Sequence, residues 1–276
     1  MRLATTAAFA LAWILPLAHA QQPVQPAAED ICSAHPSATF EVATIRPSDK
    51  PAGGSSMHAE RDSVISSGVL RRLIVFAYDM RDFQVTGGPD WVNTQVWEIH
   101  AKIDPPETDM KPADEATRRA LTERFTQRIR SLLADRFQFK CHIITKELPV
   151  YELVLVKGGA KFTETKAEPG RQHSMSSNGN SRKIDMNATG ITMADLSRSL
   201  AGNVGRPVLD KTGLTGQYDL QMTWAPAPPA AQENDAAPTG PSIFTALQEQ
   251  LGLRLVSAKG PVQVLVIDSV EKPEEN

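Results

Sequence analysis

Residues 187–222 read NATGITMADLSRSLAGNVGRPVLDKTGLTGQYDLQM, and this stretch decides the fold because an earlier stretch repeats its pattern. Residues 67–102 read SGVLRRLIVFAYDMRDFQVTGGPDWVNTQVWEIHAK. In both stretches a short amphipathic helix is followed by a short apolar strand, a turn that contains glycine and a second strand. Because the same features occur twice in the same order, the sequence predicts two copies of one structural unit.

The first helix of each copy carries apolar residues at the spacing i, i+3 and i+7. This spacing places them on one face of a helix, and we expect that face to be buried. The residues are Leu70, Leu73 and Ala77 in the first copy and Met193, Leu196 and Leu200 in the second.

Each copy continues with a second helix and two strands. We expect helices at 116–136 and 243–251, each with one apolar face. The face residues are Leu121, Phe125, Ile129, Leu132 and Leu133 in the first helix and Phe244, Leu247 and Leu251 in the second. We expect strands at 137–145, 150–156, 253–256 and 262–267, with turns at 148–150 and 260–262, where each copy has a proline.

The expected fold class is α+β, with two tandem units at 40–165 and 172–272. Each unit would pack two helices on antiparallel strands, and a pseudo-two-fold axis would relate the units. The joint between them is expected in the polar residues 166–180. Residues 225–240 are rich in proline and alanine and have little to bury, so they are expected to form a mobile insertion in the second unit.

The N-terminal 20 residues have the pattern of a secretory signal peptide. Arg2 precedes an apolar run that ends in Ala18-His19-Ala20, which predicts cleavage between Ala20 and Gln21. The alternative is a retained membrane anchor, but the run is shorter than the roughly 20 apolar residues that a spanning helix needs. Residues 21–39 are expected to be a flexible tether. With no later apolar run of that length, the chain is expected to act in the periplasm or outside the cell.

Composition limits the compartment and the partners. The two cysteines, Cys32 and Cys141, favour a disulfide if the chain is exported, and the alternative is a pair of free thiols. Lys and Arg number 29 against 32 Asp and Glu, which gives a formal net charge of −3. This balance lacks the basic excess that nucleic acids or anionic membranes attract.

The sequence contains no familiar catalytic or metal-binding motif, so we expect no cofactor and no metal. His58 and His173 would share a site only if their loops converged. Glu98 and Asp219 occupy matched strand positions and could act as an acid–base pair, although polar residues facing solvent explain them as well. The Asp210-Lys211-Thr212-Gly213 sequence resembles the phosphorylated loop of P-type ATPases over four residues, but it also fits a glycine turn.

Three tryptophans are the candidate ligand surface. Trp91, Trp97 and Trp224 lie near strand ends and turns. Large aromatic residues at such positions more often pack in a core or at a sheet edge. If the protein binds a carbohydrate or a peptide, these three are the best candidates for contacting it.

Several motifs occur in a fixed order along the chain. They are Phe40-Glu41-Val42-Ala43, Gly88-Pro89-x-Trp91, residues 132–137 (LLADRF), residues 210–219 (DKTGLTGQYD) and residues 242–253 (SIFTALQEQLGL). From Phe40 to the C-terminus the set resembles a large paralogous family of exported proteins of soil bacteria, best known from Acidobacteria, with no assigned function. The resemblance implies a signal peptide, an extracytoplasmic domain and no established activity or cofactor. Similar domains fused to membrane sensor–peptidase proteins would suit a sensing or binding role.

A weaker likeness, at the level of the fold only, links the repeated unit to the short N-terminal domains of secretins and TonB-dependent receptors. The expected function is a non-catalytic binding or interaction module of the cell envelope. It would act on a small ligand, a peptide or an envelope protein in a groove between the two units. The alternatives are a hydrolase with an unrecognised active site, which clustering of His58, His173, Glu98 or Asp219 would favour, and a purely structural envelope protein.

Overall fold

A computed structural model describes residues 32, 37–51, 55–103, 115–165, 173–180, 182–226 and 240–274. The expected signal peptide, most of the expected tether and most of the proline-rich insertion lie outside these residues. The described residues form helices and three four-stranded sheets, which confirms the α+β class.

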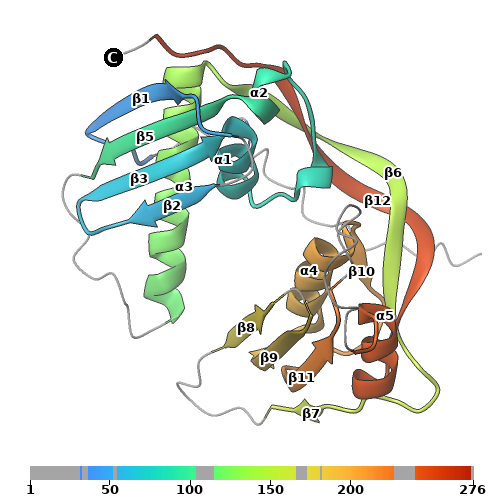
Figure 1. The fold of residues 1–276 in the computed structure, drawn as a ribbon. Helices are drawn as coiled ribbons and strands as arrows, with labels where there is room; N and C mark the ends of the chain where they lie inside the picture. The colour runs from blue at the N-terminus through green and yellow to red at the C-terminus, as the bar shows by residue number, and fades with distance from the viewer. Residues whose placement is uncertain are drawn as a thin grey trace, which may run out of the picture.

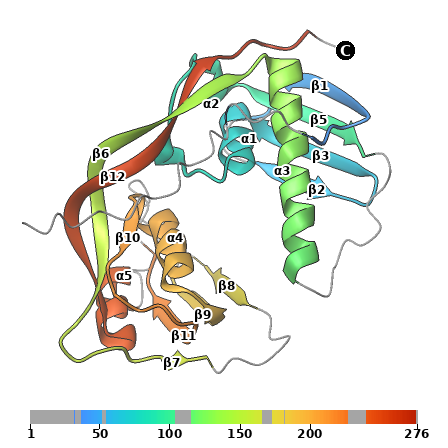
Figure 2. The ribbon, with the colours of Figure 1, turned by 180° about the vertical axis from the view of Figure 1, so that it is seen from behind.

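The first half of the chain forms a sheet of order β1-β5-β3-β2 with helices packed on it, which we call the first lobe. Helix α3 crosses one face of this sheet and contacts α1 (Figures 1 and 2). The elements of this half are β1 (Val42–Ser48), β2 (Ser56–Ala59), β3 (Ser63–Val69), α1 (Leu70–Ala77), η1 (Asp82–Gln84), β4 (Val85–Gly87), α2 (Trp91–Thr94), β5 (Val96–Lys102), α3 (Glu115–Phe137) and β6 (Lys140–Leu155).

The second half builds a second sheet, of order β7-β11-β9-β8, and with its helices this forms the second lobe. Its elements are β7 (Thr163–Glu164), β8 (Ser174–Gly179), β9 (Ile184–Ile191), α4 (Met193–Val204), β10 (Val208–Asp210), β11 (Tyr218–Trp224), α5 (Ile243–Ala246), η2 (Leu247–Leu251) and β12 (Leu253–Ser269). From β2 to β6 and from β8 to β12 the main elements follow the same order. Superposition of the two halves remains the test of the predicted pseudo-two-fold axis.

Two long strands, β6 and β12, join the lobes, and we call this pair the ribbon. They pair antiparallel from Leu155 with Leu253 to Lys140 with Ser269. In both views the ribbon runs along one side of the molecule from one lobe to the other (Figures 1 and 2). The expectation of two separate strands in each copy, divided by turns at 148–150 and 260–262, is therefore wrong.

The prolines do not break the ribbon, because each lies where its missing N–H is not needed. The amide of Tyr151 donates to the carbonyl of Pro207, on the side of β6 away from β12. Residues two apart in a strand point their N–H groups the same way, so the Pro149 nitrogen also faces away from β12. Pro261 pairs with Glu147, two residues before Pro149. Its nitrogen therefore faces away from β6 in the same way. Sequence reasoning took proline as a turn signal, whereas here each proline occupies a position that tolerates it.

Short strands from each half of the chain extend the ribbon at its two edges. Strand β4 pairs in parallel with β12, with Val85 opposite Leu265, and β10 pairs in parallel with β6, with Val208 opposite Tyr151. The ribbon strands also contribute side chains to the two hydrophobic cores. Leu265 of β12 belongs to the core of the first lobe, and Leu153 of β6 belongs to the core of the second. Each core is therefore completed by a strand from the other half of the sequence.

The predicted helix faces are confirmed for the first helix of each half. Every one of the six matched apolar residues is at most 4% exposed: Leu70, Leu73, Ala77, Met193, Leu196 and Leu200. In α3 the residues Ile129, Leu132 and Leu133 are buried, and Leu121 and Phe125 are half-buried.

Phe244 was expected on the buried face of its helix, and this is wrong. Its side chain is 42% exposed and packs edge-on against Tyr151. Helix α5 continues as a π-helical turn, Leu247–Leu251, whose wider winding changes which positions share a face. Ile243 and Ala246 are buried in its place, together with the correctly predicted Leu247 and Leu251.

The polar segment expected to be only a joint contains strand β8. Ser174–Gly179 pairs with β9 at the edge of the second sheet. Met175 is half-buried and the other five residues are exposed. Because most residues of β8 are small and polar, its composition is also typical of a loop.

The predicted disulfide is confirmed. Cys32 and Cys141 are bonded, with Cα atoms 5.5 Å apart. Both side chains pack against the core of the first lobe, so the bond fastens the N-terminal segment to the start of β6.

The ribbon's alternation can be tested with two neighbouring exposed residues. Lys146→Pro should lower the free energy of unfolding by about 1–3 kcal/mol relative to Glu147→Pro. Only residue 146 points its N–H at β12, where it pairs with Val262. Urea denaturation followed by circular dichroism measures both variants. Equal losses in the two variants would contradict the assigned alternation.

The buried face of α4 gives a second test. Leu196→Ala should cost about 2–5 kcal/mol of unfolding free energy, because the side chain is 0% exposed in the core of the second lobe. Phe244→Ala is the control and should cost less than about 1 kcal/mol, as expected for a partly exposed site. A neutral Leu196→Ala would show that α4 buries a different face.

Candidate functional site

A cleft of about 500 Å³ lies between the two lobes. The first lobe contributes Arg81 and Arg119, and the second contributes residues from β8, β9, α4 and the segment before β11. The lining residues of the second lobe are His173, Ser174, Met175, Ile191, Thr192, Asp195, Arg198, Ser199 and Gln217. Because both lobes line it, a ligand bound there would touch both.

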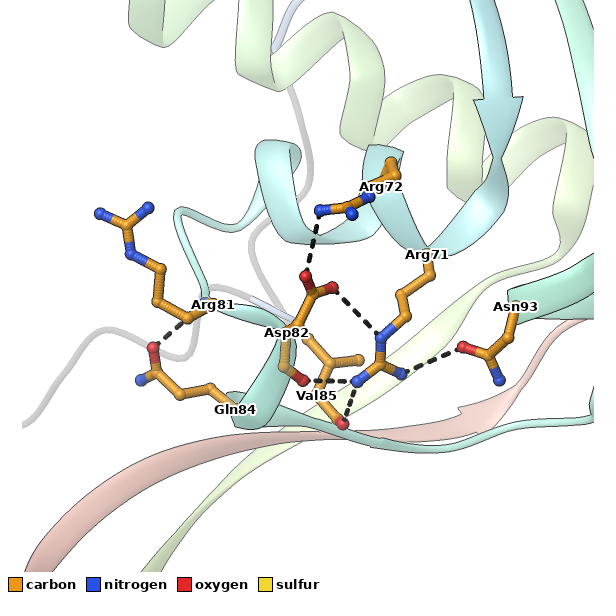
Figure 3. A network of polar contacts seen from close by, with 7 residues as sticks. All are labelled: Arg71, Arg72, Arg81, Asp82, Gln84, Val85 and Asn93. Carbon is orange, nitrogen blue, oxygen red and sulfur yellow. Dashed lines mark hydrogen bonds and ion pairs between the residues drawn. The ribbon is translucent and has the colours of Figure 1, made fainter. Parts of the chain in front are cut away.

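Arg81 lies on the connection between α1 and β4, and a polar network fixes that connection. Arg71 of α1 donates to the backbone carbonyl of Val85 over 2.9 Å and pairs with the carboxylate of Asp82 over 3.4 Å. Arg72 pairs with the other oxygen of the same carboxylate over 3.0 Å. Figure 3 shows these contacts around Asp82, with the guanidinium of Arg81 pointing away from them. The network therefore holds the backbone at residue 81 and leaves its side chain to face the cleft.

The opposite wall begins at the N-terminus of α4. The hydroxyl of Thr192 accepts a hydrogen bond from the amide of Asp195 over 3.2 Å, and the Asp195 carboxylate accepts from the amide of Thr192 over 3.1 Å. These two bonds form a capping box, which satisfies amides that the helix itself cannot pair. Arg198, one turn later, pairs with Asp195 over 3.4 Å.

The same contacts change the acidity of Asp195. Partial burial raises the pKa of its carboxyl group, but hydrogen bonds from the Thr192 side chain and backbone and the charges of Arg198 and His173 lower it. The net result is a pKa below the ordinary value of 3.8. Asp195 is therefore ionised at neutral pH and is held by its own helix.

His173 is positioned by a contact with a neighbouring strand. Its ring nitrogen Nδ1 contacts the carbonyl of Gly190, and the amide of Gly190 donates to the Asp219 carboxylate over 2.8 Å. Gly190 has a φ of 65°, and a Cβ atom there would lie 3.1 Å from the histidine ring. The tight approach of the ring therefore requires glycine at this position. Thr165 also donates to Asp219, over 2.7 Å.

The cleft has a positive balance of charge. Its lining contains the three arginines Arg81, Arg119 and Arg198 and one carboxylate, Asp195. Guanidinium groups present planar arrays of donors that match carboxylate and phosphate oxygens. The cleft can therefore receive an anionic group.

The residues proposed for catalysis do not come together. His58 is exposed on β2 of the first lobe. Glu98 pairs with Lys50 over 2.7 Å, and the hydrogen bond from Lys50 lowers the pKa of the Glu98 carboxyl group. Of the four candidates only His173 lines the cleft. Asp219 is linked to His173 indirectly, because its carboxylate accepts a hydrogen bond from the amide of Gly190 and the carbonyl of Gly190 contacts the His173 ring. No group of three His, Cys, Asp or Glu side chains among the described residues could hold a metal ion.

The three tryptophans do not form one surface. Trp97 and Trp224 are each 3% exposed and belong to the cores of different lobes. Trp91 is half-buried and packs edge-on against Trp97, with ring centroids 6.0 Å apart. Their observed contacts are those of core packing, and a role in ligand binding remains a prediction.

The Asp210-Lys211-Thr212-Gly213 sequence forms the expected turn. The Asp210 carboxylate accepts hydrogen bonds from the amide of Thr212 over 2.9 Å and from its hydroxyl over 2.8 Å. Gly213 has a φ of 73°, as a glycine turn requires. These local contacts account for the motif.

Sequence reasoning missed the three arginines of the cleft. Arg81, Arg119 and Arg198 are far apart in the sequence, and each is one cation among 29 Lys and Arg. No local motif marks them. The only available signal was the expectation of a groove where the two units meet.

Residues 71–270 match a family model described as "Protein of unknown function (DUF3738)". The chain belongs to this family. The matched region begins in α1 and includes both walls of the cleft and the ribbon. The comparison with curated proteins and the comparison with solved structures found no match. None of the helices formed by the described residues combines the length and hydropathy that crossing a membrane requires.

The capping box predicts how stability depends on pH. Thr192→Ala should lower the free energy of unfolding by about 1 kcal/mol, because it removes the cap of α4. The contribution of Asp195 is fully present above the unfolded pKa near 3.8 and is lost as the pH falls through the lower folded pKa. When the pH is lowered from about 6 to about 3, the free energy of unfolding of Asp195→Asn should therefore fall by less than that of the wild type. Urea midpoints at both pH values measure this, and identical losses would contradict the prediction.

Proposed function

We propose that this protein is a non-catalytic binding module of the cell envelope and that the cleft between its lobes is the binding surface. The observation that carries the proposal is that residues of both lobes line one cleft, on backbone that local hydrogen bonds hold in place. Arg81 extends from a braced connection, and Thr192 and Asp195 are fixed by the helix they cap. Sites held in place before the ligand arrives lose less entropy on binding.

The first lobe has a hollow at the matching position. Comparing the two hollows supports the cleft as the binding site. A hollow of about 410 Å³ lies between β2 and α1, lined by Met57, Val69 and Phe76 among others. In the register that matches Leu73 with Leu196, Phe76 corresponds to Ser199 in the cleft. One copy therefore has a large aromatic residue where the other has a small polar one.

The second helix of each half differs in length, and only the long one contributes an aromatic residue to the hollow. Phe125 of α3 packs edge-on against Phe76, with ring centroids 5.6 Å apart, and it lines the first hollow. Helix α3 has 23 residues, whereas α5 has four and η2 adds five. The short second helix provides no counterpart to Phe125 in the lining of the cleft. Consequently the cleft stays open and polar.

Two observations support a place outside the cytoplasm. The Cys32–Cys141 disulfide is typical of oxidising compartments. The sequence also resembles an exported family of soil bacteria, and its N-terminal 20 residues have the pattern of a signal peptide. An envelope protein with a cleft of this size would bind a small ligand or a peptide segment.

A substitution that fills the cleft tests this function. Ser199→Phe places in the cleft the aromatic side chain that the first copy carries at the matched position, and Ser199→Ala is the control. A thermal-shift screen of metabolites and short peptides should find ligands that raise the Tm of the wild type and of Ser199→Ala. Ser199→Phe should show no such rise. Ligands that stabilise Ser199→Phe as strongly as the wild type would place binding elsewhere and contradict the proposal.

A further inference from the structure

We infer that the ligand of the cleft carries an oxyanion group, a carboxylate or a phosphate, which Arg81 of the first lobe and Arg198 of the second hold between them. This inference rests on the proposed function, because it specifies what the same cleft binds. The two arginines lie close together. The Nη2 atom of Arg81 donates to the backbone carbonyl of Arg198 over 3.2 Å.

Arg81 differs from the arginines near it in how its charge is balanced. Arg72 pairs with Asp82 over 3.0 Å, and Arg130 pairs with Glu123 over 3.7 Å. Among the residues that the structure describes, no carboxylate lies within ion-pair distance of Arg81. A guanidinium has five N–H donors, so the bond to Arg198 leaves donors for a ligand. A half-buried cation without a neutralising partner attracts an anion more strongly than a paired one.

The single acid of the cleft competes only weakly for that position. The Asp195 carboxylate accepts hydrogen bonds from the hydroxyl of Thr192 over 2.6 Å and from its amide over 3.1 Å. Its pair with Arg198 is longer, at 3.4 Å, and on an exposed side chain. A surface pair of this kind contributes little, so an incoming oxyanion can share the Arg198 guanidinium.

The position of the two arginines makes the ligand a bridge between the lobes. Arg81 extends from the connection between α1 and β4, and Arg198 lies on α4. An oxyanion can accept from two guanidinium groups at once, because it has several lone pairs. One group bound to both would therefore fasten the lobes at a point away from the ribbon.

Two kinds of ligand share this chemistry, and they can be told apart. A small oxyanion would need only the arginines. An acidic peptide could also run along β8, an edge strand whose residues Ser174 and Met175 line the cleft. The probes are therefore inorganic phosphate, citrate and hexaglutamate, with hexalysine as the probe of opposite charge.

The experiment measures affinity by isothermal titration calorimetry with the mature protein at low and at physiological salt. Arg81→Gln and Arg198→Gln should each weaken binding of the anionic probe about tenfold, the loss expected for one charged hydrogen bond. Added salt should also weaken binding. Arg254→Gln is the matched control, because Arg254 is an exposed arginine outside the cleft lining, and it should bind like the wild type.

Arg81→Lys adds a variant that keeps the charge. It should fall between the wild type and Arg81→Gln, because an ammonium cannot donate in the planar array of a guanidinium. Circular dichroism melting confirms that each variant is folded. If Arg81→Gln fails to fold, the inference is tested by Arg198→Gln alone. It should still bind the anionic probe more weakly than the wild type, while Arg254→Gln binds normally.

Each outcome has a definite meaning. Binding of phosphate or citrate that depends on Arg81 and Arg198 supports a small oxyanion, and binding of hexaglutamate alone supports an acidic peptide. If none of the anionic probes binds the wild type at low salt, or if Arg254→Gln weakens binding equally, the inference is wrong. An uncharged ligand that binds the wild type and is blocked by Ser199→Phe would overturn this inference and leave the proposed function standing.

Discussion

The hydrogen-bonded ladder between β6 and β12 is the interaction on which the rest of the structure depends. It pairs residues from Lys140 to Leu155 with residues from Ser269 to Leu253, and so it crosses from one lobe to the other. Each lobe takes part of its core from a ribbon strand of the other half, through Leu265 in the first and Leu153 in the second. Because the backbone bonds run continuously, the lobes cannot separate without breaking the ladder.

The cleft is a consequence of this arrangement and of one difference in length. Strands β4 and β10 lie on opposite edges of the ribbon, and each follows the first helix of its half of the chain, α1 or α4. In the first lobe the long α3 packs against α1 and adds Phe125 to the lining of the hollow beside it. In the second lobe the short α5 leaves the matching hollow to face the space between the lobes. The second helix is long in the first lobe and short in the second, and the hollow beside it is mostly apolar in the first lobe and more polar in the second.

The charges around the cleft divide into those that brace the fold and those that line the cleft. Asp82 holds Arg71 and Arg72 and so fixes the connection that carries Arg81. Asp195 is held mainly by the helix cap that it completes with Thr192. Carboxylates committed to such structural bonds leave the positive balance of the cleft intact. The lining of the cleft therefore carries more arginines than carboxylates at the place where the two halves of the chain meet.

The sequence by itself determined what depends on neighbouring residues. Spacing identified the buried faces of α1 and α4, and cysteine number indicated the bond between Cys32 and Cys141. Only the tertiary structure decided what depends on residues far apart in the chain. It showed that two prolines lie inside continuous strands, because their nitrogens face away from the ladder. It also brought Arg81 to Arg198, a contact between residues that share no local pattern, since strand pairing and not periodicity sets their distance.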